Sequence, residues 1–173
     1  MMRTLKWLVC AICFYNPLAW AAELAKELSV FSPYLGTWQA RFSMAADAPA
    51  VEDVSRWERA LNGTAIRTLH SINQGEYGGE SLIFWDKQKQ SLVFYYFTTA
   101  GFYTSGRIEV ISEYEFAAYE QVVGDQNGIT QVKSTSRFKE GQFSVATQYF
   151  KQGKWTAPQT RIYTPSKKAV VFK

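Results

Sequence analysis

Alternation of apolar and polar residues is the dominant pattern along most of the chain. Nearly every segment after the first thirty-odd residues alternates or is rich in Val, Ile, Tyr, Phe and Thr, with turn dipeptides about every ten residues. We therefore predict an all-β fold, an up-and-down antiparallel β-barrel of about eight to ten strands. A short helix is predicted before it over 23–31, where Leu24, Leu28 and Phe31 have helical spacing and Pro33 closes the run.

Two hairpins predict a register. The run 53–73 is split by Asn62-Gly63, a strong signal for a two-residue turn because both turn positions favour positive φ. Directly opposed residues share a face of the sheet. The inner face of this hairpin then holds six residues: Trp57, Arg59, Leu61, Ile66, His70 and Ile72.

The second hairpin turns at Glu140-Gly141. Its inner face pairs Phe138 with Phe143, Ser136 with Val145, Ser134 with Thr147 and Val132 with Tyr149. A solid core would avoid these hydroxyls, because a buried hydroxyl without a partner costs about 1 to 3 kcal/mol. We therefore expect a cavity that holds water or a ligand.

Both faces of the run 92–97 are apolar or aromatic, so one row, Tyr95 and Phe97, must point away from the barrel interior. We expect the N-terminal helix to cover it, with a homodimer contact or an exposed ligand lip as alternatives. The run 114–123 is expected to be a strand. Four acidic residues are expected to lie on a solvated strand face: Glu109, Glu113, Glu115 and Glu120.

Residues 1–22 have the features of a cleaved signal peptide. Arg3 and Lys6 precede a short apolar run, and small residues follow at 19–22. An alternative is a lipid-bearing cysteine at Cys10 or Cys13. We predict export to the periplasm or the medium, with 23–173 forming one domain. The apolar run is too short to span a bilayer and no later run is long enough, so an integral membrane protein is not expected.

Composition and charge narrow the function. The 173 residues are 47% hydrophobic, enough for one compact domain with a large core. Without residues 1–22 no cysteine remains, so neither a disulfide nor a cysteine metal site is expected. Basic residues fall from 19 to 17 against 15 acidic ones, a net charge of +2, which does not suggest a nucleic-acid partner.

The run Gly36-Thr37-Trp38 at the entry to the first strand resembles the Gly-x-Trp signature of the calycin superfamily, the lipocalin-like barrels. The chain is similar in particular to bacterial lipocalin-like domains of unknown function, through 153–155 and 161–163. The resemblance implies that Trp38 plugs one barrel end and that Arg161 packs over it in a cation–π stack. Gly36, Trp38 and Arg161 are then structural residues.

We expect the barrel to bind a small hydrophobic or amphipathic ligand without changing it, and predict no catalytic residue, metal or cofactor. Arg59 is the main candidate, because an enclosed guanidinium needs an anion or water. Fatty-acid-binding calycins hold a carboxylate with interior Arg and Tyr, which Arg59 and Tyr149 resemble. An Arg59 that reaches solvent at the barrel mouth is the alternative. The expected cavity residues are Trp57, Arg59, His70, Phe94, Tyr96, Ser136, Phe143 and Tyr149.

Three other functions stay open. If the barrel were filled, the protein would have a structural or protein-interaction role, and Tyr95 and Phe97 would then contact a partner. His70, the single histidine, is a candidate haem or metal ligand, although haem-binding calycins carry theirs near the C-terminal strand. A hydrolase is conceivable because Ser55 opposes His70 and Asp53 shares their face, but a flat strand lacks the sharp turn that exposes a nucleophile.

Overall fold

The computed structural model describes residues 23–43 and 48–173. The predicted signal peptide lies outside the described residues. The elements, in chain order, are η1 (Lys26–Tyr34), β1 (Gly36–Ser43), β2 (Ala50–Ala60), η2 (Leu61–Gly63), β3 (Ala65–Ile72), β4 (Tyr77–Asp86), β5 (Ser91–Thr98), β6 (Tyr103–Ser112), β7 (Glu115–Val123), β8 (Ile129–Lys139), β9 (Gln142–Lys151), β10 (Lys154–Trp155) and β11 (Gln159–Pro165).

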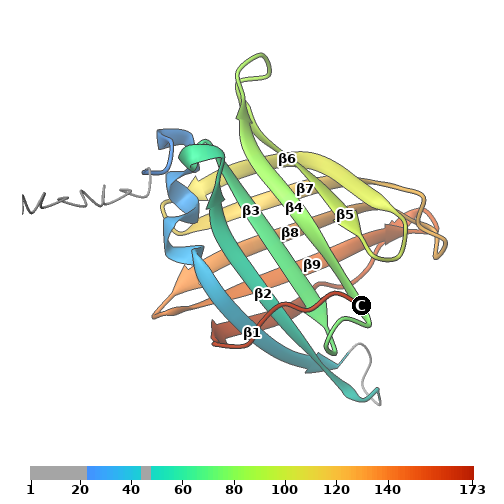
Figure 1. The fold of residues 1–173 in the computed structure, drawn as a ribbon. Helices are drawn as coiled ribbons and strands as arrows, with labels where there is room; N and C mark the ends of the chain where they lie inside the picture. The colour runs from blue at the N-terminus through green and yellow to red at the C-terminus, as the bar shows by residue number, and fades with distance from the viewer. Residues whose placement is uncertain (1–22, 44–47) are drawn as a thin grey trace, which may run out of the picture.

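Ten of these strands close into an antiparallel up-and-down barrel (Figure 1). Neighbours along the chain pair from β1 to β9, and β11 closes the circle by pairing with both β9 and β1. The two-residue β10 adds to the same edge of β9. The predicted all-β barrel with a short N-terminal helix is confirmed, including the strand predicted over 114–123.

Both predicted hairpin registers are confirmed. Ser55 opposes His70 and Trp57 opposes Thr68 across β2 and β3, while Ser136 opposes Val145 across β8 and β9. Asn62 and Gly63 have φ values of 54° and 83°, as the turn between β2 and β3 requires. Leu61 also has a positive φ, and its side chain is exposed, so its expected place on the inner face was wrong.

The N-terminal helix covers the end of the barrel at which β1 begins. It is a 3-10 helix that starts three residues later than predicted and includes Pro33 in its last turn. Its buried side chains are Leu28, Val30, Phe31 and Tyr34. Neither described helix is long and apolar enough to cross a membrane.

The outer row on β5 lacks the expected cover. Tyr95 is 43% exposed and Phe97 is 56% exposed. The prediction that the helix covers this row was wrong, because the helix buries its apolar residues against the rings inside the barrel end.

An aromatic plug fills the helix end of the barrel. We use this name for Phe31, Tyr34, Trp38, Trp57, Phe116, Phe138 and Phe143. Tyr34 lies at ring-centroid distances of 5.2 to 5.7 Å from four other members. The indole Nε1 of Trp38 donates to the carbonyl oxygen of Tyr34 at 2.7 Å. Trp38 therefore plugs one barrel end, as the resemblance implied.

Candidate functional site

The other half of the barrel contains a partly open cavity of about 830 Å³. This is within the range of about 300 to 1,000 Å³ that is usual for small-molecule sites. Near the aromatic plug the lining is mainly apolar, with Trp57, Ile83, Phe94, Ile108 and Phe116. The hydroxyls of Ser134, Ser136 and Thr147 also line it, so the cavity predicted from the second hairpin is confirmed.

Towards the opposite end, polar side chains surround the cavity. We call them the polar belt: Asp53, His70, Tyr77, Tyr96, Thr104, Glu120, Tyr149, Arg161 and Tyr163. These nine residues come from eight strands, β2 to β7, β9 and β11, and two of them lie on β11.

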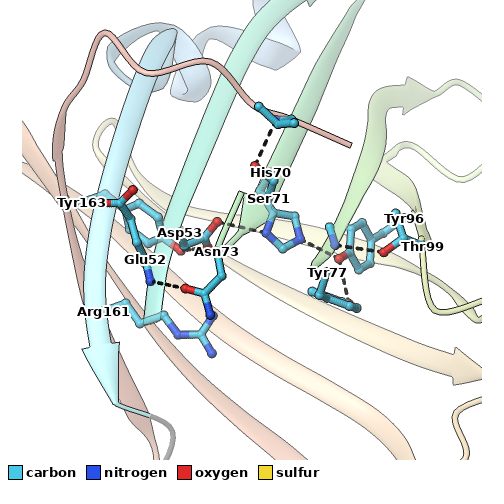
Figure 2. Close-up of polar contacts among 12 residues, drawn as sticks. Glu52, Asp53, His70, Ser71, Asn73, Tyr77, Tyr96, Thr99, Arg161 and Tyr163 are labelled. Atoms are coloured by element: carbon cyan, nitrogen blue, oxygen red, sulfur yellow. Dashed lines mark hydrogen bonds and ion pairs between the residues drawn. The ribbon is translucent and has the colours of Figure 1, made fainter. Parts of the chain in front are cut away.

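Five members of the belt form one hydrogen-bonded chain, which Figure 2 shows. The Tyr163 hydroxyl donates to Asp53 Oδ2 at 2.7 Å, and Asp53 Oδ1 lies 3.1 Å from His70 Nδ1. His70 Nε2 lies 2.6 Å from the Tyr96 hydroxyl, which lies 2.9 Å from the Tyr77 hydroxyl. With Asp53 ionised, Nδ1–H of His70 donates to it and Nε2 accepts from Tyr96.

The tyrosine hydroxyls of this hydrogen-bonded chain stay neutral. Burial raises the pKa of Tyr77, Tyr96 and Tyr163 above the ordinary tyrosine value. Asp53 is almost fully buried, and its two oxygens accept from Tyr163 and His70. Buried polar groups that are paired with one another in this way stabilise a fold, and they do not need a ligand to complete their hydrogen bonds.

Arg161 is the cation of the cavity. Its guanidinium lies 4.0 Å from the centroid of the Phe42 ring, and its Nη2 is 3.5 Å from the Tyr149 hydroxyl. Its Nε is buried without a hydrogen-bond partner in 23–43 and 48–173, and no carboxylate of these residues forms an ion pair with it. Buried polar groups normally have partners, so an orphaned guanidinium nitrogen on a cavity wall is unusual.

The expected stack of Arg161 on Trp38 was wrong. In the ladder between β1 and β11, Trp38 opposes Pro165, four residues beyond Arg161. The same register carried along the strands puts Arg161 opposite Phe42, whose ring it covers. The arginine that the resemblance made structural is therefore part of the cavity.

Glu120 lines the cavity, and the prediction that it lies on a solvated strand face was wrong. It lies on the inner face of β7 and lines the cavity, whereas Glu109 and Glu113 are exposed. Side chains alternate along a strand, so Glu115 and Glu120, five residues apart, cannot share a face. The apolar alternation of Phe116, Ala118 and Val122 was the signal that could have found it.

The Glu120 carboxyl sits in a low-polarity position. Thr104 Oγ1 donates to its Oε2 at 2.7 Å. Burial raises the pKa of Glu120 to about 7, an effect that the Thr104 hydrogen bond only partly offsets. Glu120 opposes Gly106, where the Tyr119 backbone and the Phe94 ring leave no room for a Cβ.

Six of the eight expected cavity residues line the cavity: Trp57, His70, Phe94, Tyr96, Ser136 and Tyr149. Arg59 does not. Its side chain is exposed because it lies one residue from the end of β2, at the plugged end of the barrel, where a long side chain reaches solvent. Phe143 is 2% exposed within the aromatic plug, so it too lies outside the cavity lining.

The other candidate chemistries find no matching geometry among the described residues. Both ring nitrogens of His70 are engaged, by Asp53 and Tyr96, and no hydrogen bond joins His70 to Ser55. Outside the masked stretches 1–22 and 44–47, no three His, Cys, Asp or Glu side chains group as metal ligands would.

Comparison with known proteins supports the fold. The chain is similar to the crystal structure of Rv2717c from M. tuberculosis, with a TM-score of 0.63 and 11% identity over 84% of this chain and 100% of that chain. No family model and no curated protein matches the sequence. At this identity the likeness concerns architecture alone, and it places the chain among ten-strand antiparallel up-and-down β-barrels.

Proposed function

We propose that this protein is an exported, calycin-like barrel that binds a small amphipathic molecule with an anionic group and does not change it chemically. The shape and lining of the cavity support this. Its volume of about 830 Å³ suits a small organic ligand. Its apolar half lies against the aromatic plug and its polar belt lies towards the other end, so an apolar tail and a polar head have separate places.

Arg161 is the observation that carries the proposal. A guanidinium cannot lose its proton, and its burial with no carboxylate of the described residues within ion-pair distance is unfavourable. An anionic head bound here would receive hydrogen bonds from the terminal guanidinium nitrogens, a geometry that suits carboxylates. The Tyr149 hydroxyl beside Nη2 would add a further donor. This role is the one first expected of Arg59.

The test is titration with a fluorescent fatty acid, followed by displacement with dodecanoate and, as an uncharged probe, dodecanol. We expect Arg161→Met to weaken dodecanoate binding about 10-fold to 100-fold, since hydrogen bonds to a charged group contribute about 1.5 to 3 kcal/mol. Dodecanol affinity should change little. Arg59→Met is the matched control and should bind as the wild type does.

Two outcomes would refute the proposal. One is a wild-type protein that binds neither probe. The other is an Arg161→Met variant that keeps full affinity for dodecanoate.

Export and self-association remain predictions. Export rests on residues 1–22, and detection of a mature N-terminus near residue 23 in secreted or periplasmic material would test it. A homodimer through Tyr95 and Phe97 is testable by analytical ultracentrifugation, with Phe97→Ser as the variant expected to dissociate it.

A further inference from the structure

Two groups of the polar belt stand apart from the rest. The chain from Tyr163 to Tyr77 is hydrogen-bonded internally, with partners for each member. Arg161 has an orphaned Nε, and the Glu120 carboxyl has one donor, on Oε2, and no cation beside it within the described ranges. The polar belt therefore has one cation and one carboxyl whose hydrogen-bonding groups are not all paired within the described residues.

These two groups flank the same sector of the wall. Glu120, Val132 and Tyr149 follow one another across β7, β8 and β9 on a single rung of the sheet. Tyr149 then reaches Arg161 on β11. Three strand spacings, about 14 Å, separate β7 from β11 across the wall. Arg161 pairs with Val145, so it is also offset from the Glu120 rung by four residues, about 13 Å along the strand. Between the two groups the wall presents Val132 and Tyr149 on the Glu120 rung, and the hydroxyls of Ser134 and Thr147 on the way to Arg161.

We propose that the ligand is a hydroxylated amphipathic acid, whose acidic group binds Arg161 and whose hydroxyl binds Glu120. This inference rests on the proposed function and specifies the class of ligand. A hydroxyl fits the carboxyl because it can donate to the ionised form and accept from the protonated form. Ligands without the hydroxyl should bind more weakly, since they leave a buried carboxyl oxygen unpaired.

The test compares dodecanoate with a set of monohydroxydodecanoates that differ only in the position of the hydroxyl. We expect at least one position to bind about 5-fold to 10-fold more tightly than dodecanoate, the usual effect of one hydrogen bond. Glu120→Val should abolish this gain and leave dodecanoate binding intact, which also shows that the variant is folded. Glu120→Gln keeps an acceptor and should keep most of the gain. Glu113→Gln, an exposed acid, is the control.

The outcomes separate the two proposals. If dodecanoate binds through Arg161 but no hydroxyl position gains affinity, or the gain survives in Glu120→Val, this inference is overturned and the proposed function stands. If an aminododecanoate binds more tightly than every hydroxy acid and loses affinity in Glu120→Gln, the second group is an ammonium and the hydroxyl is refuted. If no acid binds, both proposals fail.

Discussion

The two ends of the barrel are built from the same strands in opposite ways. On β9, Phe143 belongs to the aromatic plug and Tyr149 to the polar belt. On β2, Trp57 reaches the plug while Asp53 lies in the belt. The plug is held by ring packing and the belt by hydrogen bonds.

The two ends of the barrel differ in how completely their buried polar groups are paired. The plug has no unpartnered polar group, whereas the belt holds the orphaned Arg161 Nε and the pKa-shifted Glu120. Unfavourable buried groups of this kind are retained where a ligand uses them, and perturbed titratable groups concentrate at functional sites. Stability should therefore depend most on the plug and specificity most on the belt.

The largest effect is expected from the plug. Phe143→Ala removes a ring that is 2% exposed and that contacts Tyr34, Trp38 and Tyr163 at centroid distances of 5.2, 5.1 and 4.7 Å. We expect it to lower the free energy of unfolding by about 3 to 5 kcal/mol, the usual cost of such a cavity. Urea denaturation measures this loss.

Phe97→Ala is the matched control, because the same side chain there is 56% exposed on the outer row. Its effect should stay within about 1 kcal/mol. Equal losses in the two variants would show that the plug is not the stabilising end.

The fold was predictable from the sequence because its signals are local. Alternation marks the strands, and the turns at Asn62-Gly63 and Glu140-Gly141 fix two registers without reference to the rest of the chain. Alternation also gives the face of each residue. Alternation does not give the position of a residue along the barrel axis. Arg59 and Phe143 were therefore assigned to the correct face of the sheet, but they lie at the plugged end and not beside the cavity.

The site was less predictable because it is assembled from distant strands. Tyr163 and Asp53 are 110 residues apart and meet only because β11 and β2 flank β1. Tyr77 and Asp53 give no sequence signal of a shared hydrogen-bonded chain. Arg161 was assigned to Trp38 by resemblance, and only the observed register between β1 and β11 moves it to Phe42.

A smaller effect is expected from Glu120 and should depend on pH. Its folded pKa of about 7 lies above that of an unfolded glutamate. Between these values the unfolded chain has released the proton that the folded chain keeps, so stability falls as pH rises from about 4.5 to 7 and levels off above. The loss is of the order of 3 kcal/mol.

Urea denaturation from pH 4.5 to 8 measures this slope, with Glu120→Gln as the reference. The difference between the two proteins isolates the contribution of Glu120. Parallel curves for wild type and variant would contradict a carboxyl shifted by burial.

The smallest effect, and the one that separates the two ends most directly, is expected at Arg161. Replacement by Met keeps an apolar side chain over Phe42 and removes a buried cation that has no carboxylate partner in the described parts of the chain. Because such a charge is unfavourable, we expect stability to be unchanged or to rise by about 1 kcal/mol while anion affinity falls. Arg67→Met, on the outer face beside Glu58 and Glu80, is the control and should lower stability slightly. A large loss of stability in Arg161→Met would instead make this arginine part of the barrel's support, and the polar belt would then stabilise the fold as the aromatic plug does.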